Sequence, residues 1–308
     1  MITYYRFTDS DIELCGPNDA DFINLEDPTQ LEVDSIESEF QLPHTFLNDP
    51  LDPRERPRVE QETPATLIII RVPRLPMAQE PHNLTTVPLG IILNKEKIFT
   101  VCRDVELVDV LLQRVTRKPK PNCRFSVAFK LLIESSTDFI DHLERLEELT
   151  DMAESTLSKA QQNEEIMMLL TIDKALINFS VALRSNRGIM AKLMENTIIH
   201  LRPDELELLE RALTENQQAI FTADIFGQIL GSMSDAFGTV ISNNLNKVVK
   251  FLTGITIVLM LPTLIAGLYG MNVALPFERH PYAFWIIIFG CFISCIFLWL
   301  FLYRKKWL

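Results

Sequence analysis

The chain has 308 residues, of which 47% are hydrophobic, and its formal net charge is −12. The charge divides along the sequence: residues 247–308 carry six Lys or Arg and one Glu, a net of +5, so residues 1–246 carry 23 minus 40, or −17. An acidic domain of this size repels nucleic-acid phosphates, which excludes nucleic acid as a partner. It suits a divalent cation, although a merely soluble acidic surface accounts for most of these charges.

The first 123 residues predict a cytosolic α/β domain. Strands are expected at 2–7, 65–72, 87–93 and 97–102, where apolar residues alternate or run continuously, with the last two strands as a hairpin. Short helices are expected near 31–36 and 40–43 and a longer one at 105–115. Four prolines between residues 48 and 64 predict a loop there.

From residue 124 onward the sequence predicts helices alone. Residues 124–202 carry apolar side chains at helical spacing and predict a long antiparallel hairpin of helices at 125–163 and 164–196. Acidic residues between 141 and 154 form one dense polar face, which predicts a solvated helix surface. Pro203, with acids in the following turn, predicts a helix start, and no proline follows until Pro262. One helix over 203–271 would be about 100 Å long, which gives a stalk at 203–246 that continues into a membrane.

Two uncharged stretches predict a two-helix transmembrane domain at 247–308. The first, Phe251 to Tyr269, has nineteen residues, roughly 28 Å of helix, and the second, Ala283 to Tyr303, has twenty-one. Lysines precede the first span and basic residues follow the second, so both chain ends are expected in the cytoplasm and the 270–282 loop outside. Pro262 lies inside the first span, where water lining a channel is expected to satisfy the carbonyl that it frees.

Four polar residues, with two apolar residues among them, share one face of the helix that forms the first span. They are Asn246, Val249, Thr253, Thr256, Met260 and Thr263, at steps of three and four residues. Such a stripe fits a water-filled path, and it equally fits a seam between packed helices. Because one chain has a single stripe, a pore requires a symmetric oligomer.

The end of the first span carries a recognisable motif. Tyr269-Gly270-Met271-Asn272, followed by a short loop, a second span and a basic terminus, resembles the CorA family of magnesium and cobalt transporters, most closely over 230–308. The resemblance implies an α+β membrane protein: an N-terminal α/β cytosolic domain, a long helical hairpin, and a stalk helix continuing into the first of two C-terminal transmembrane helices. It also implies that the protein is a symmetric homopentamer. Each chain would cross the plasma (inner) membrane more than once and contact the lipid bilayer.

The resemblance further implies the parts of an ion pathway. Gly270, Met271 and Asn272 would form the selectivity filter, and Asn246 a polar ring at the cytosolic end of the pore. Val249, Leu252 and Met260 would form apolar constrictions, with Thr253, Thr256 and Thr263 lining the path. Asp235 would form an acidic ring on the stalk, and Arg304, Lys305 and Lys306 a basic ring around the inner helices. Asn272 and Asp235 are the residues expected to meet the metal.

Mg2+ is expected as both the transported and the regulatory ion, with no other cofactor, and the chain is not expected to be an enzyme. The sequence contains no GxxxxGK[ST] loop, so ATP-driven pumping is not expected. A divalent ion entering an interior-negative cell gains ~4.6 kcal/mol per 100 mV, which suffices to drive uptake. Arg211 stands where an acidic partner of the intersubunit site is expected, so that site is not placed, and Glu278 is the one acid in the loop.

Three alternatives remain open. A Zn2+ transporter of the same family is one, although Met271 at the middle of the triplet argues against it. Transport of Co2+ or Ni2+ as the main task is another. The third is a membrane-anchored helical scaffold without a pore, in which the polar stripe is a packing seam.

Overall fold

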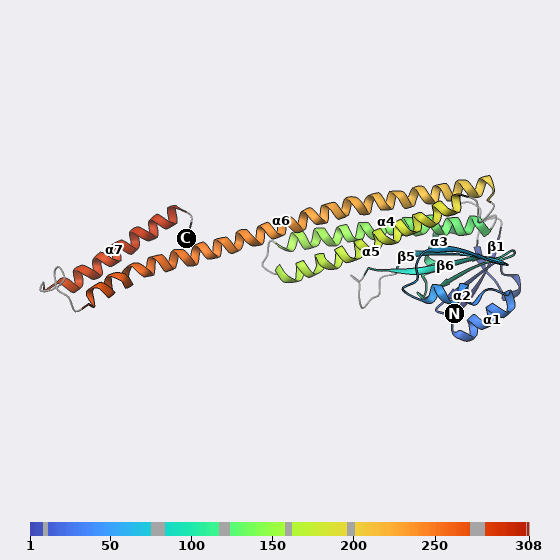
Figure 1. The fold of residues 1–308 in the computed structure, drawn as a ribbon, viewed down its shortest axis with the longest axis horizontal. Coiled ribbons are helices and arrows are strands. Elements are labelled where there is room, and N and C mark those ends of the chain that lie inside the picture. The colour runs from blue at the N-terminus through green and yellow to red at the C-terminus, as the bar shows by residue number, and fades with distance from the viewer. Residues whose placement is uncertain are drawn as a thin grey trace. The chain divides into compact units, whose positions relative to one another are not determined.

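The computed structural model describes residues 1–8, 12–74, 84–116, 124–157, 162–195, 201–271, 281–305 and 307. The chain divides into two compact units, Met1–Leu230 (unit 1) and Gly231–Leu308 (unit 2). The strands are β1 (Ile2–Phe7), β2 (Ile12–Leu14), β3 (Phe22–Glu26), β4 (Arg58–Glu62), β5 (Ala65–Pro73), β6 (Thr86–Leu93) and β7 (Ile98–Cys102). The α-helices are α1 (Gln30–Phe40), α2 (His44–Asn48), α3 (Leu107–Thr116), α4 (Arg124–Leu157), α5 (Gln162–Met194), α6 (Pro203–Tyr269) and α7 (Ala283–Arg304) (Figure 1).

Unit 1 is built on a seven-stranded mixed sheet with the order β2-β1-β3-β7-β6-β5-β4. β3 and β7 pair in parallel, and the other neighbours are antiparallel. β6 and β7 form the predicted hairpin, closed by a bond from the Asn94 N–H to the Lys97 carbonyl at 3.0 Å. The central strands are buried along their whole length because helices cover both faces.

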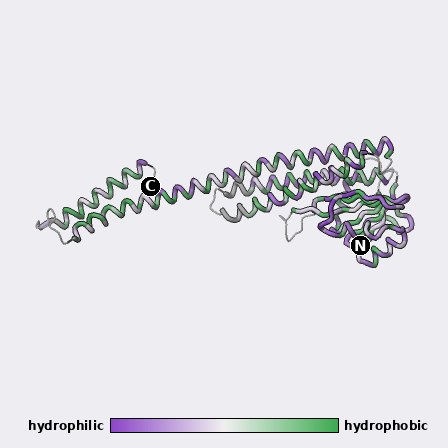
Figure 2. The backbone as a smooth tube through the Cα atoms, in the orientation of Figure 1, coloured by the Kyte–Doolittle hydropathy of each residue, from purple (hydrophilic) through white to green (hydrophobic). Residues whose placement is uncertain are grey.

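The two faces of the sheet carry separate cores. Along β5, Leu67 and Ile69 point to the side of α1 and α2, where they join Phe46 in one cluster. Ile68 and Ile70 point the other way, into the cluster that contains the buried residues of α3 and α4. Figure 1 shows the sheet between these two helical layers, and Figure 2 shows its strands as hydrophobic. The unit is therefore an α/β/α sandwich, as the period-two pattern of β5 requires.

The long helices of unit 1 pack through apolar and aromatic side chains. Phe139 of α4 meets Phe179 of α5 edge to face, with ring centroids 5.4 Å apart. The beginning of α6 is held by burial of Ala212, in the same core as α4, and by an ion pair from Arg184 to Asp224 at 2.6 Å. The predicted helical hairpin is present as α4 and α5, and α6 is the predicted continuous helix. The domain boundaries at 123, 202 and 246 stay predictions.

Two predictions for the N-terminal domain are wrong. A short helix was expected near 40–43, but α1 ends at Phe40 and α2 begins at His44. Residues 48–64 were expected to form a loop, but they contain β4, whose Val59 pairs with Ile68 of β5. β4 is a sheet edge with charged residues at alternate positions, so it lacks an apolar run that would have indicated a strand. The sequence reading also missed β2 and β3, whereas the expected strands at β1, β5, β6 and β7 are confirmed.

Unit 2 contains the end of α6 and the antiparallel α7. Cys295 of α7 lies level with Val258 of α6, and its thiol is 3.7 Å from the Val258 carbonyl oxygen. Towards the other end of the pair, Tyr269 and Phe284 line one cavity. Both helices are long and apolar enough to cross a membrane. Among the described residues, no charged side chain lies between Lys250 and Tyr269 or between Ala283 and Tyr303.

Candidate ion pathway

The predicted stripe occupies the side of α6 that faces away from α7. At about 100° per residue, its members fall within an arc of about 120°. They are Asn246, Val249, Leu252, Thr253, Thr256, Met260 and Thr263, and all of them are exposed in the single chain. Gly254, Val258, Leu261, Pro262 and Ile265, which are less exposed, centre on the opposite side, where α7 packs. Within the part of the chain that the structure describes, this face of α6 is thus uncovered.

The stripe is hollowed near its C-terminal end. Thr256, Met260 and Thr263 line one open groove on α6, together with Leu264 and Gly267. Met260 is 68% exposed and Leu252, further along the same face, is 63% exposed. Large apolar side chains therefore alternate with hydroxyls along a surface that none of the described residues covers.

The threonine hydroxyls in this groove are acceptors only. Thr256 donates its hydroxyl proton to the Leu252 carbonyl at 2.8 Å, and Thr263 donates to the Leu259 carbonyl at 2.9 Å. Each proton is consumed within the helix, one turn back. The lone pairs of each Oγ1 remain available to a hydrogen-bond donor in the groove.

α6 ends at the predicted filter. The Gly270 N–H donates to the Ala266 carbonyl at 2.9 Å, and the Met271 N–H donates to the Leu268 carbonyl at 3.3 Å. A Cβ atom at Gly270 would lie 3.3 Å from the Ala266 oxygen, a tight contact. Met271 is 54% exposed. Asn272, the third residue of the triplet, lies outside the described residues, so its relation to the other two stays a prediction.

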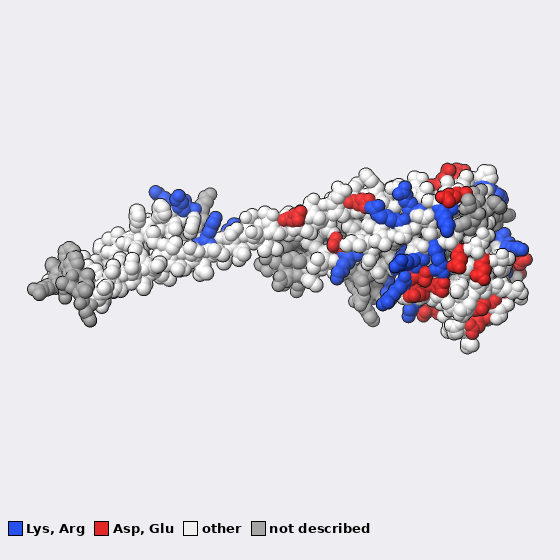
Figure 3. Space-filling model, viewed as in Figure 1, with Lys and Arg blue, Asp and Glu red and all other residues white. Residues whose placement is uncertain are grey.

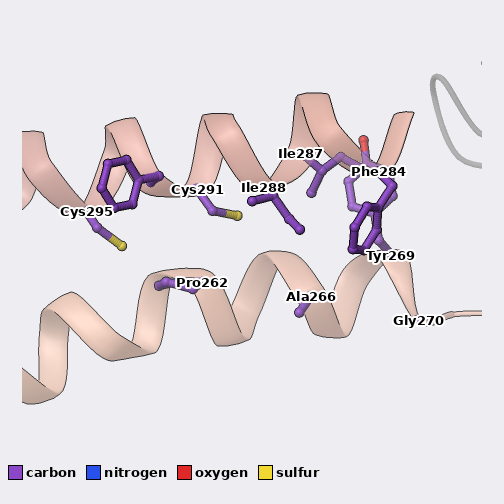
Figure 4. Close-up of a pocket in the computed structure, with 10 residues that line it drawn as sticks. Pro262, Ala266, Tyr269, Gly270, Phe284, Ile287, Ile288, Cys291 and Cys295 are labelled. Atoms are coloured by element: carbon purple, nitrogen blue, oxygen red, sulfur yellow. The ribbon is translucent and has the colours of Figure 1, made fainter. Parts of the chain in front are cut away.

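Pro262 frees a carbonyl on the far side of α6 from the stripe. Proline has no N–H to donate to Val258, four residues earlier. The Val258 oxygen is met by the Cys295 thiol of α7, and Figure 4 shows Cys295 pointing from α7 toward α6 beside Pro262. The prediction that channel water satisfies this carbonyl is therefore wrong, because the oxygen points at α7. The sequence contained no signal for this contact.

Charged side chains frame the apolar part of unit 2. Lys250 precedes the apolar part of α6, and the α6–α7 register brings Arg304 level with Val249. Arg304 and Lys305 are exposed, and Lys306 lies outside the described residues. Figure 3 shows the basic groups of unit 2 gathered at one end of an otherwise nearly uncharged surface.

Asp235 lies on the same side of α6 as the stripe, three turns before Asn246. Its side chain is exposed, and its backbone carbonyl accepts from the Thr239 hydroxyl at 3.1 Å. In the part of the chain that the structure describes, no three His, Cys, Asp or Glu side chains converge to hold a metal. The structure thus brings the stripe residues and Asp235 onto one face of α6. It places the two described basic residues, Arg304 and Lys305, at the end of α7, where the register brings Arg304 level with Val249.

Comparisons with known proteins support the resemblance over nearly the whole chain. A family model described as "CorA-like Mg2+ transporter protein" matches residues 18–304. The cobalt/magnesium transport protein CorA of Methanocaldococcus jannaschii is 24% identical over 291 residues, which cover 92% of this chain and 90% of the relative. The protein of the same name from Thermotoga maritima is 20% identical over 270 residues, which cover 85% of this chain and 76% of the relative.

Solved structures share the fold. The complete structure of the CorA magnesium transporter from M. jannaschii matches with a TM-score of 0.83 and 22% identity, covering 100% of this chain and 99% of that chain. The full-length CmaX protein matches with a TM-score of 0.72 and 16% identity, covering 99% of this chain and 97% of that chain. The predicted plan of an N-terminal α/β domain, a long helix and two apolar C-terminal helices is confirmed. With the family model matching almost end to end, the chain belongs to the CorA family of magnesium and cobalt transporters.

Proposed function

We propose that this chain is one subunit of a symmetric pentameric channel that admits hydrated Mg2+, and also Co2+, down the membrane potential. The observation that carries the proposal is the stripe on α6, which presents acceptor oxygens on the face turned away from α7. One such face cannot enclose a path, whereas several copies around an axis can, with α7 on the outside toward lipid. A pore with this wall conducts the ion without a carboxylate inside the bilayer.

The chemistry of the ion suits such a wall. Mg2+ loses its water reluctantly, and the hydrogens of its bound waters point outward as donors. A wall of acceptor oxygens matches that shell, and neutral oxygens hold the ion weakly enough to release it. Gly270, Met271 and Asn272 would supply neutral oxygens at the outer mouth. Charged oxygens there would bind the ion more tightly and slow its exit.

Gating in this proposal uses the apolar members of the stripe. Val249, Leu252 and Met260 would close the path by dewetting when the helices approach one another. Asp235 would form an acidic ring at the cytosolic approach, while Arg304 and Lys305, with Lys306, would form a basic ring outside the pore helices. Both chain ends would lie in the cytoplasm of a cell bounded by the plasma (inner) membrane.

Regulation would follow from the acidic domain. Each domain carries −17 over residues 1–246, so five copies around an axis repel one another. Mg2+ held between neighbouring domains would screen that repulsion and keep the channel shut. Loss of Mg2+ from the cytosol would let the domains separate and the channel open.

Uptake of Mg2+ into proteoliposomes tests the filter. We expect Asn272→Ala to reduce the flux, and hexaammine cobalt, which mimics the hydrated ion without releasing ligands, to compete with Mg2+ in the wild type. Asn243→Ala is the matched control, because Asn243 is exposed on α6 outside the arc of the stripe. Undiminished flux in Asn272→Ala would contradict the filter, and no flux in any variant would favour a scaffold. Parallel assays with Zn2+, Ni2+ and Co2+ rank the ions.

A further inference from the structure

Unit 1 contains a polar cavity of about 550 Å³ that ion conduction does not use. It lies between the turn that follows Pro53, the ends of β5 and β6, and α5. Three arginines line it, Arg54, Arg56 and Arg71, together with Thr85 and Asn178. All of its lining residues belong to unit 1. A cationic cavity in a domain of high net negative charge requires an explanation.

Arg71 is built into the wall. Its Nε donates to the Thr86 hydroxyl at 2.8 Å, and its Nη1 donates to the Pro53 and Glu55 carbonyls at 3.1 and 2.9 Å. These acceptors are neutral, and no carboxylate of the described residues pairs with this guanidinium. Burial accordingly lowers the pKa of Arg71. The bonds fix the turn after Pro53 against β6 and leave a positive charge at the cavity wall.

Arg54 and Arg56 extend from this turn with exposed side chains. Within the described part of the chain, neither guanidinium lies within ion-pair distance of a carboxylate. Glu55 is the one acid in the lining, and its carboxylate is bound by Arg58, which lies outside the lining. The cavity therefore offers free guanidinium groups with no competing free acid.

We propose that this cavity binds a small phosphorylated anion, of the size of a nucleoside polyphosphate. The guanidinium fork matches two phosphate oxygens at once, which an ammonium group does not. The Thr85 hydroxyl and the Asn178 amide add neutral donors at the rim, and the volume falls in the range of small-molecule sites. Because the lining is cationic, it favours phosphate without bound Mg2+. Bound Mg2+ would neutralise part of the negative charge of the phosphate.

Calorimetry on the full chain in detergent tests the proposal with three separate probes: Mg2+-free ATP, ADP and inorganic phosphate. We expect saturable binding of at least one probe, weakened about tenfold or more in the Arg54→Ala/Arg56→Ala double variant. Asn178→Trp, at an exposed position of α5, fills the cavity and is expected to abolish binding. Arg211→Ala, at an exposed position of α6 outside the lining, is the control and is expected to bind as the wild type does.

The pattern across probes identifies the ligand class. Competition by inorganic phosphate supports a site for the phosphate group itself, and binding of ATP or ADP alone supports a nucleotide site. Excess Mg2+ is expected to weaken the binding of ATP. The proposal is overturned if no probe binds saturably, if Arg211→Ala loses as much affinity as the double variant, or if Mg2+ strengthens ATP binding. None of these outcomes depends on ion flux, so the channel proposal stands or falls separately.

Discussion

Replacing Thr256 and Thr263 together by Val would remove both hydroxyls from the groove on α6 and keep the shape of each side chain. Neither substitution leaves a backbone carbonyl without a hydrogen bond, because the Leu252 and Leu259 carbonyls still accept from backbone N–H groups within α6. Valine keeps the branched carbon that fills the same volume. The double variant therefore tests the acceptor oxygens of the stripe with little change to the fold.

The magnitude follows from the state of the hydroxyls. Both protons are donated within the helix, at 2.8 and 2.9 Å, so each oxygen contributes only as an acceptor toward the groove. In the proposed pentamer the two threonines form two rings about 10 Å apart along the axis, so a hydrated ion meets them one after the other. If two hydroxyls of a ring at a time each give about 1 kcal/mol to the waters of the ion, the loss at each ring is about 2 kcal/mol. A barrier raised by that amount slows passage roughly thirtyfold.

The assay is Mg2+ uptake into proteoliposomes that contain a magnesium-sensitive dye. Ser294→Ala is the matched control, because the Ser294 hydroxyl donates to the Gly290 carbonyl at 2.8 Å in the same way but lies on α7. We expect the control to conduct at the wild-type rate. The reasoning is refuted if the double threonine variant conducts like the wild type, or if Ser294→Ala slows uptake by the same factor.

Three predictions concern unit 1. Asn186→Ala is expected to lower the free energy of unfolding by about 2 kcal/mol, because the buried Asn186 amide accepts from the Arg71 N–H at 2.9 Å and donates to the Arg71 carbonyl at 2.7 Å. Arg71 lies beyond the end of β4, so faster hydrogen exchange at its amide measures the loss. Burial raises the pKa of Cys102 to about 12, so this thiol is expected to resist alkylation near pH 8 in the folded protein. On unfolding the thiol returns to its ordinary pKa of 9.0 and is expected to react, which mass spectrometry of the labelled chain checks. Arg184→Ala is expected to cost less than about 1 kcal/mol in urea unfolding, since the pair with Asp224 is largely exposed, with a smaller effect in high salt.

The helical part of the chain was predictable because its signals are local. The position of α6 follows from Pro203 at its start and from an uninterrupted run up to Pro262. The arc of the stripe follows from residue spacing alone, since a helix converts steps of three and four into one face. The placement of α7 on the opposite side required the structure, because spacing within one helix does not say which face its neighbour takes.

β3 shows why part of the sheet was missed. Its five residues are all buried, yet they include Asn24 and Glu26, which a sequence reading assigns to a surface loop. The two polar groups are satisfied inside the protein: Asn24 donates to Glu26 at 3.1 Å and accepts from Thr100 of β7 at 2.8 Å. Such compensation depends on a strand more than seventy positions away, and no local pattern contains it.

No local pattern shows where the carbonyl freed by Pro262 points, and its direction matters for the ion pathway. A carbonyl freed on the stripe side of α6 would be an unpaired dipole facing the groove, and it would attract a cation strongly enough to compete with the ion's own water. The freed oxygen of Val258 instead points at α7, where the Cys295 thiol meets it. The side-chain oxygens of the stripe itself are the threonine hydroxyls and the Asn246 amide. We infer that the carbonyl freed by Pro262 is turned away from the ion, so that a hydrated ion meets only weak acceptors along the apolar part of this face.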